Sequence, residues 1–292
     1  MNDKYVFKNF NLEGEAPSSD LACERRRADI REPGVEYSKT QGVIGVWERI
    51  TVSSEEGARQ IGRPRGCYNT LNLPRMDGMD QCEIEDAKDE VARELCRLFD
   101  REGIKPDRLL VVGLGNRALT PDAVGPESAD RVRATMHIKE MDDDMFEGLD
   151  CSEIAVIKPG VTAESGIDTR DIVEGVCSVI SPDAIIVIDA LASRSPTRLG
   201  TTIQLATTGL SPGSGLGNRR GAITEEELGI PVFSIGVPTV INSRMFIVEN
   251  GEARAKNEKE GMFVAPKDIN DITKNASKIV AGAINQAFGI DF

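Results

Sequence analysis

The architecture follows from two apolar segments, Leu109-Leu-Val-Val-Gly-Leu-Gly-Asn116 and Ala184-Ile-Ile-Val-Ile-Asp189. Each is typical of a buried parallel strand that runs into a loop, because strands covered on both faces are almost continuously apolar. In open α/β sheets the ligand crevice lies at the carboxyl ends of such strands. The first segment continues through Thr120-Pro-Asp-Ala-Val-Gly-Pro126, so we expect Asp122 and Asp189 to face one cleft.

Asp122 and Asp189 suit acid–base chemistry in a chain with a single histidine, His137. Asp189 follows five apolar residues, and a desolvated carboxylate needs a partner or a task. Asp122 could instead be a first-turn carboxylate that complements a helix dipole. Two carboxylates close together hold one proton over a broad pH range, so that one takes a proton from water while the other donates one. The sequence does not assign the two roles, and this chemistry requires no metal or other cofactor.

Composition excludes several classes of protein. With 292 residues, the chain is long enough for a large core in one or two domains. A net charge of −13 argues against a broad nucleic-acid-binding surface. We expect no membrane span and no signal peptide, and hence a cytoplasmic protein. The six cysteines form no Cys-x-x-Cys pair, so metal-finger and thioredoxin-type sites are not expected and the thiols should be reduced.

Periodicity and turn residues predict an alternation of strands and helices. Residues 1–40 are interpreted as an irregular arm, followed by a β-rich section at about 42–75. Helices are predicted at 83–99, from about 121 towards 136, at about 169–179 after an Asp168 cap, and at 269–287 before Gly289; further strands are predicted at 154–157, 184–188 and 232–235. His137 should end a helix and have a structural role, since no Gly-x-Ser-x-Gly elbow accompanies it.

Two glycine-rich segments raise the question of phosphate binding. The turn at Gly113-Leu-Gly-Asn116 has Ala118 where a dinucleotide fingerprint has its third glycine, and no Walker lysine follows, so nucleotide binding is disfavoured. The second segment, Ser211-Pro-Gly-Ser-Gly-Leu-Gly-Asn-Arg-Arg220, is either a flexible surface loop or a substrate-binding loop. On the second interpretation substrate contacts come from Asn116, Ser214, Asn218 and Arg219, and the two asparagines could donate to a carbonyl or an oxyanion.

Five ordered motifs between about 108 and 241 resemble one known family. They are Val112–Pro126, Gly166-Ile-Asp-Thr-Arg-Asp-Ile-Val173, Pro182–Arg194, Ser211–Arg220 and Leu228-Gly-Ile-Pro-Val-Phe-Ser-Ile-Gly-Val-Pro-Thr-Val240. With these motifs the chain resembles the germination proteases of spore-forming bacteria, endopeptidases that degrade small acid-soluble spore proteins during germination.

That resemblance implies an α/β fold, with a mostly parallel twisted sheet flanked by helices like that of the hydrogenase maturation peptidases and with the added β-rich section. It also implies an aspartic-type endopeptidase with Asp122 and Asp189 at the catalytic positions, a homotetramer, and a location in the spore core. The segment Ser19-Asp-Leu-Ala-Cys-Glu24 resembles the family's self-processing sequence. The scissile bond is therefore expected at Asp20–Leu21, which makes 1–20 a pro-segment and 21–292 a single α/β peptidase domain.

The chain departs from the family pattern at two places, and two other functions stay open. The region 242–261 is shorter than usual, and Ser211 stands where the family has histidine. One alternative is a metal-assisted maturation peptidase on the same fold, with the two aspartates as ligands. The other is a non-catalytic phosphate- or nucleotide-binding protein.

Overall fold

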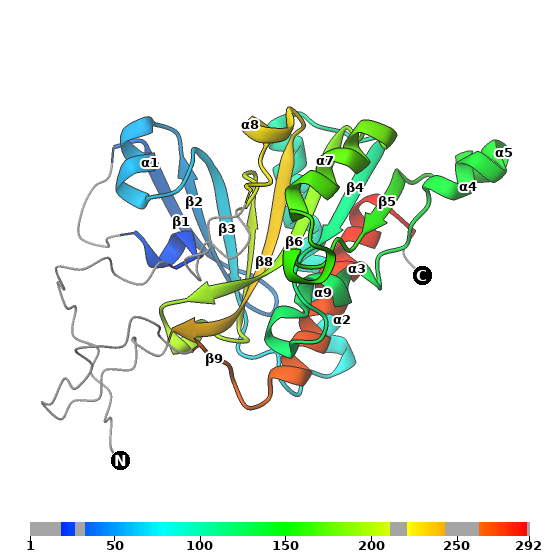
Figure 1. The fold of residues 1–292 in the computed structure, drawn as a ribbon. Helices are drawn as coiled ribbons and strands as arrows, with labels where there is room; N and C mark the ends of the chain where they lie inside the picture. The colour runs from blue at the N-terminus through cyan, green and yellow to red at the C-terminus, as the bar shows by residue number, and fades with distance from the viewer. Residues whose placement is uncertain (1–18, 27–32, 211–220, 243–262, 291–292) are drawn as a thin grey trace, which may run out of the picture.

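The computed structural model describes residues 19–26, 33–210, 221–242 and 263–290. Over these ranges nine strands form one sheet in the order β1-β2-β3-β7-β8-β6-β4-β5, and β9 pairs with β8 (Figure 1). The strands are β1 Val35–Gln41, β2 Val46–Val52, β3 Gly66–Asn72, β4 Arg108–Gly113, β5 Glu153–Ile157, β6 Ala184–Ser193, β7 Thr202–Ala206, β8 Val232–Asn242 and β9 Phe263–Val264.

One half of the sheet is parallel and the other is antiparallel. Strands β5, β4, β6 and β8 are parallel, and they contain the predicted buried runs, with Leu109–Val112 and Ala184–Ile188 fully buried. The strands of the predicted β-rich section, β2 and β3, join the same sheet through β7 by antiparallel pairing. An α/β fold with an added β-rich section is therefore confirmed.

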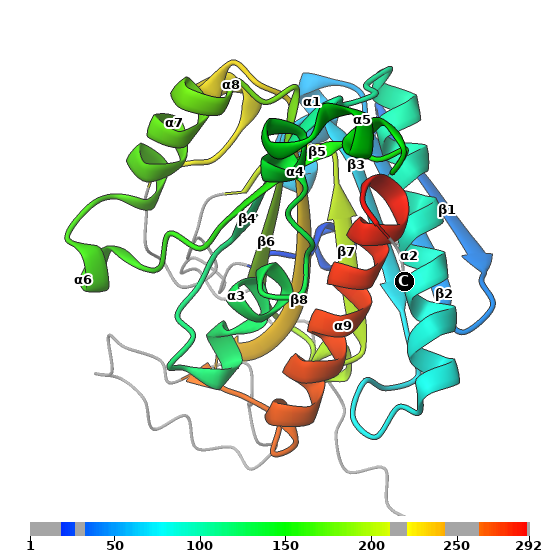
Figure 2. The same cartoon turned by 90° about the vertical axis from the view of Figure 1, so that its right-hand side faces the viewer.

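Helices cover both faces of the sheet. In Figure 2, α2 and α9 lie side by side on one face, whereas α7 covers the other. The helices are α1 Glu55–Ile61, α2 Gln81–Glu102, α3 Val124–Ala129, α4 Met136–Met141, α5 Asp143–Glu147, α6 Thr162–Ser165, α7 Thr169–Ile180, α8 Glu225–Leu228 and α9 Ile269–Phe288, with short 3-10 helices η1 Ala22–Glu24, η2 Thr120–Asp122 and η3 Pro196–Arg198. As predicted, Asp168 caps α7 by accepting the N–H of Arg170.

Three local predictions were wrong. Part of the presumed arm, Val35–Gln41, forms β1, an edge strand whose side chains are mostly exposed and so show no apolar alternation. The helix expected from 121 towards 136 stops at Ala129, and Thr135 then donates its N–H to Ile154 of β5. His137 consequently lies near the start of α4, where it is exposed.

The strand predicted at 184–188 continues to Ser193, with a register shift between Leu191 and Ala192. Asp189 therefore lies inside β6, beyond the point where the neighbouring strand β4 ends at Gly113. Among the described helices, none has the length and apolar character needed to cross a membrane.

Candidate active site

Asp189 is a buried carboxyl group. Among the described residues, no lysine or arginine forms an ion pair with it. It is 6% exposed, and its Oδ1 accepts the N–H of Ala190 at 2.9 Å. Burial is the main cause that raises the pKa of Asp189 well above its ordinary value, and the charges of Asp122 and Asp20 raise it further. The N–H of Ala190 opposes this shift without cancelling it. Asp189 thus favours its protonated form.

Asp122 reaches Asp189 from the turn that follows β4. It ends η2, and its Oδ2 accepts the backbone N–H of Asn116 at 2.8 Å. Gly115 makes this turn possible, because its φ is +112° and a Cβ there would lie 2.1 Å from the main-chain oxygen of Asp122. Gly125 does the same for the start of α3, where a Cβ would lie 2.0 Å from the oxygen of Leu114 and 2.5 Å from that of Ile188. The glycines of the motif thus allow the turn to pack on the ends of β4 and β6.

Two buried threonines hold η2 in place, and neither belongs to a sequence pattern that predicts this role. Thr239 of β8 donates its hydroxyl to the oxygen of Pro121 at 2.6 Å. Thr273 of α9 donates to the oxygen of Thr120 at 3.2 Å. Both side chains are fully buried. Their role depends on contacts between elements more than 100 residues apart, which a local pattern cannot reveal.

The predicted processing residues lie at the same place. Asp20 exchanges two hydrogen bonds with Ala192 of β6: its N–H donates to the Ala192 oxygen at 2.9 Å, and its Oδ2 accepts the Ala192 N–H at 2.9 Å. The charge of Asp20 also contributes to the raised pKa of Asp189. Leu21, the next residue, is fully buried. The segment that contains Asp20 and Leu21 is therefore bonded to the end of β6, within the electrostatic influence of Asp189.

Glu24 anchors this segment to the end of β6. Its carboxylate accepts hydrogen bonds from Ser193 Oγ at 2.8 Å, from the N–H of Arg194 at 2.7 Å and from the N–H of Ser195 at 2.9 Å. The hydroxyl of Ser19 donates to the same carboxylate, which closes residues 19–24 into a compact turn. The processing motif contains Glu24 but does not predict this role, because Arg194 lies 170 residues away in the chain.

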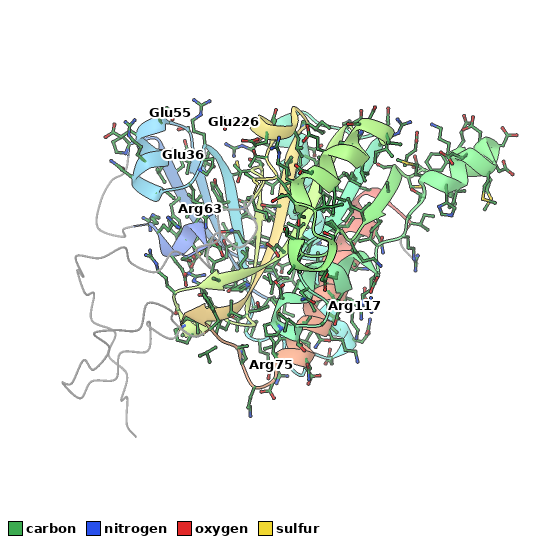
Figure 3. The ribbon with its side chains drawn as sticks, viewed as in Figure 1. Glu36, Glu55, Arg63, Arg75, Arg117 and Glu226 are labelled. Carbon is green, nitrogen blue, oxygen red and sulfur yellow. The ribbon has the colours of Figure 1, made fainter. Side chains whose placement is uncertain are left out.

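Arg63 holds the other side of the segment. Labelled in Figure 3 beside η1, it donates from Nη2 to the main-chain oxygen of Ser19 at 2.7 Å. Its Nη2 also lies 3.5 Å from Oδ1 of Asp20. The segment is thus bonded on one side to β6 and on the other to Arg63.

The remaining predicted substrate contacts are only partly placed. The backbone of Asn116 holds Asp122, while its side-chain oxygen accepts the N–H of Ala118 at 2.8 Å in a local turn. Ser214, Asn218 and Arg219 lie outside the described residues, as does the whole of 211–220. Within the described ranges, no cluster of three or more His, Cys, Asp or Glu side chains could hold a metal ion.

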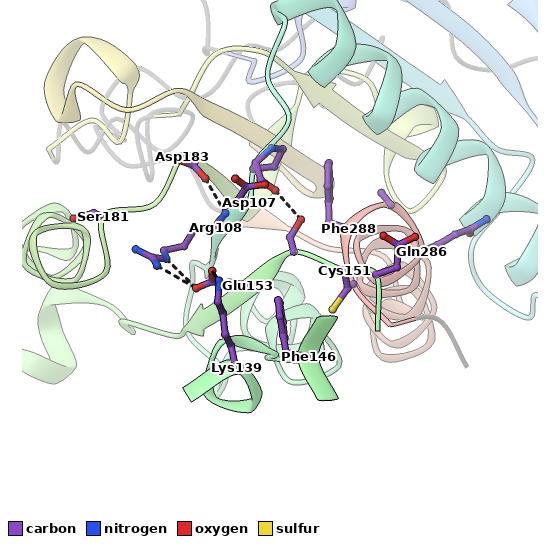
Figure 4. Close-up of a pocket in the computed structure, with 15 residues that line it drawn as sticks. Asp107, Arg108, Lys139, Phe146, Cys151, Glu153, Ser181, Asp183, Gln286 and Phe288 are labelled. Carbon is purple, nitrogen blue, oxygen red and sulfur yellow. Dashed lines mark hydrogen bonds and ion pairs between the residues drawn. The ribbon is translucent and has the colours of Figure 1, made fainter. Parts of the chain in front are cut away.

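A cavity lies at the opposite end of the parallel strands from Asp122 and Asp189. It has a volume of about 630 Å³ and is lined by residues that precede β4, β5 and β6 (Figure 4). Glu153 at its centre is paired with Arg108 at 3.2 Å and with Lys139 at 2.6 Å. Ligands of open α/β sheets bind at the carboxyl ends of strands, so Asp122 and Asp189, rather than this cavity, are the candidate site.

Comparison with known proteins identifies related chains. A family described as "Germination protease" matches residues 17–250. A germination protease of Caldanaerobacter subterraneus subsp. tengcongensis is 35% identical, over 92% of this chain and 93% of that protein. One from Clostridium perfringens is 37% identical over 82% of each chain, and one from Priestia megaterium is 39% identical over 77% of this chain and 62% of that protein.

Among solved structures, the crystal structure of the [NiFe] hydrogenase maturation protease HycI from Thermococcus kodakarensis is similar. The match covers 66% of this chain and 99% of that one, with 16% identity and a TM-score of 0.38. A likeness at that level carries no argument about function.

Proposed function

The chain belongs to the germination protease family, and from that membership we propose that it is an aspartic-type endopeptidase acting on small acid-soluble spore proteins. The observation that carries the catalytic type is the pair itself. A buried Asp189 with a raised pKa lies within the field of Asp122, whose carboxylate is held by the N–H of Asn116. Such a pair retains one proton and can therefore act as acid and base together.

The environments of the two residues suggest a division of labour. Burial favours the protonated form of Asp189, while Asp122 is partly exposed and accepts a backbone N–H. In the proposed reaction Asp122 takes a proton from water as the water oxygen adds to the peptide carbonyl carbon, and Asp189 donates its proton to the carbonyl oxygen. Collapse of this intermediate breaks the C–N bond: one of its hydroxyl protons returns to Asp189, and the proton on Asp122 passes to the leaving nitrogen. The two protons of the pair and water are thus accounted for, and the titration belongs to the pair.

We further propose that residues 1–20 are a pro-segment removed by self-cleavage at Asp20–Leu21. The seating of residues 19–24 beside the aspartates supports this, since the bond that would be cut is already near the groups that would cut it. Until cleavage, this segment occupies the place that a substrate needs. Action as a homotetramer in the spore core is part of the same proposal and rests on family membership alone.

The test is cleavage of a purified small acid-soluble spore protein by the wild-type chain and by Asp122→Asn and Asp189→Asn variants. Each variant should lose at least about 10³-fold in kcat, as expected when a general acid or base is removed. Activity should be unchanged by a chelator, which separates this reaction from a metal-assisted peptidase. Full activity in either variant would overturn the aspartic mechanism, and inhibition by the chelator would favour the metal-assisted alternative.

A further inference from the structure

The buried side chain of Gln204 forms hydrogen bonds with the backbone on both sides of Leu21. Its Oε1 accepts the N–H of Ala22 at 2.9 Å, and its Nε2 donates to the main-chain oxygen of Asp20 at 3.2 Å. A backbone N–H can only donate and a carbonyl can only accept, so the two partners fix which end of the amide is which. Gln204 is 7% exposed, so little water competes for these bonds.

The sheet places Gln204 in register with Asp189. Gln204 of β7 pairs with Gly236 of β8, and Gly236 pairs with Asp189 of β6. Residues paired across strands project from the same face, so the amide and the carboxyl group lie on one face, about 10 Å apart at their backbones. A Cβ on Gly236 would lie 2.3 Å from Cδ1 of Leu191, so Leu191 fills the space between the two side chains close to the sheet. Residues 20–22 lie against Gln204 on this face.

We propose that Gln204 is a catalytic residue of the self-cleavage reaction, which holds the carbonyl oxygen of the Asp20–Leu21 peptide bond. This proposal rests on the proposed function. As water adds to the Asp20 carbonyl carbon, the C=O electron pair moves onto the oxygen that Nε2 already contacts. Asp122 takes a proton from the water, and Asp189 donates its proton to the charged oxygen. When the C–N bond breaks, a hydroxyl proton returns to Asp189 and the nitrogen of Leu21 takes up the proton from Asp122. A donor in place before the reaction stabilises the developing charge without reorganisation, an effect worth about 10²–10³ in rate.

Gln204 could instead act only as an anchor, and other residues allow the two roles to be separated. Arg63 donates to the oxygen of Ser19, one peptide bond before the bond to be cut, so it seats the segment without touching the reacting carbonyl. Loss of Arg63 should therefore loosen the segment, whereas loss of the Gln204 donor should slow the bond-breaking step itself.

The experiment measures the first-order rate of self-cleavage of the full chain by mass spectrometry, for Gln204→Met, Gln204→Glu and the control Arg63→Met. Both Gln204 variants should be about 10²-fold slower than wild type at neutral pH, and Arg63→Met less than tenfold slower. Gln204→Glu keeps an acceptor for Ala22 but loses the donor. Burial should raise the pKa of the new carboxyl above its ordinary value of about 4.3. Once the pH falls below that raised pKa, the carboxyl is protonated and can donate again, so the rate of Gln204→Glu relative to wild type should recover, while that of Gln204→Met should not.

Thermal unfolding of each variant checks that it is folded. If Gln204→Met cleaves itself at the wild-type rate, or if Gln204→Glu shows no recovery at low pH, Gln204 is not the donor. If Asp189→Asn remains inactive in that case, the proposed function stands and only this inference fails. If Asp189→Asn also cleaves itself normally, the proposed function fails as well.

Discussion

Two buried carboxyl groups at opposite ends of the parallel strands behave in opposite ways. Glu153 begins β5 and is 7% exposed; Asp189 lies beyond the end of β4 and is 6% exposed. Burial would raise the pKa of Glu153, but hydrogen bonds from Lys139 and Arg108 outweigh it and lower the pKa. At Asp189 only the N–H of Ala190 opposes the effect of burial, and the charge of Asp122 raises the pKa further.

The difference separates a carboxylate paired with cations from the one that we propose to be catalytic. The extent of burial is nearly the same, so burial alone cannot mark a catalytic residue. What differs is the neighbour: two cations at one end, a second carboxylate at the other. A fold keeps an unfavourable pair of this kind where it serves the chemistry.

Among changes away from the two aspartates, the largest effect should come from breaking the turn that positions Asp122. We predict that Gly115→Ala destabilises the protein by about 2–4 kcal/mol and lowers kcat at least about 10²-fold, because the new methyl group would overlap the main chain of Asp122 at a φ of +112°. Urea unfolding and cleavage of the spore-protein substrate measure the two effects.

Gly103 provides the matched control for that substitution. It also has a positive φ, +71°, but a Cβ there would meet nothing within 4 Å. Gly103→Ala should cost about 1 kcal/mol of stability and leave kcat unchanged. If Gly115→Ala were as mild as Gly103→Ala, the turn would not be what positions Asp122.

The parallel strands and the two aspartates could be predicted from the sequence, because the signals that mark them lie in short segments of the chain. The strands containing Leu109–Val112 and Ala184–Ile188 are buried on both faces, so the apolar run alone reveals them. Asp122 and Asp189 follow from the same rule, because carboxyl ends of parallel strands meet at one edge. β1 escaped prediction because an exposed edge strand needs no apolar alternation.

The residues that sequence reasoning missed act across long separations. Gln204 meets Asp20 only because β7, β8 and β6 pair in a given register, and Thr239 meets Pro121 only because η2 packs on β8. Neither residue belongs to a local pattern, and the pairing of strands distant in sequence depends on the whole core. The pairing of Glu153 could not be predicted for the same reason, because its partners Arg108 and Lys139 come from separate elements.

A second, intermediate effect concerns stability as a function of pH. Asp189→Asn should stabilise the protein at neutral pH, whereas Glu153→Gln should destabilise it, each by about 2–4 °C in Tm. The raised pKa of Asp189 means that its ionisation opposes folding, so removing it helps above the unfolded value of about 3.9. The pKa of Glu153 is lowered, so its ionisation favours folding. Glu153→Gln should therefore destabilise the protein at pH values above the unfolded pKa of about 4.3.

Both differences in Tm between variant and wild type should disappear at acidic pH. As pH falls from the folded pKa of Asp189 towards 3.9 or so, the wild type gains a proton and the advantage of Asp189→Asn disappears. As pH falls through the lowered folded pKa of Glu153, the penalty of Glu153→Gln disappears too. Tm measured by calorimetry from pH 3 to 8 should show two curves on opposite sides of wild type, and two curves on the same side would contradict the contrast.

The smallest effect tests a third carboxylate, Glu24, which lies at the catalytic end but is held by donors. Two backbone N–H groups and the hydroxyl of Ser193 donate to it, and Arg198 lies 3.9 Å from its Oε1. We predict that Glu24→Gln slows self-cleavage about tenfold, equivalent to about 1.4 kcal/mol, because the neutral amide accepts weaker hydrogen bonds and loses one acceptor atom.

Glu24 holds residues 19–24 without touching the reacting bond. The lower rate should therefore be confined to self-cleavage, with no change in the cleavage of substrate. A Glu24→Gln chain that has completed its cleavage should then digest substrate at the wild-type kcat if the new N-terminus leaves the site. Glu56, an exposed residue of α1, serves as the control, and Glu56→Gln should change neither rate. Unaltered self-cleavage in Glu24→Gln would show that the donors around Glu24 do not position the bond, and would leave that task to Arg63 and Gln204.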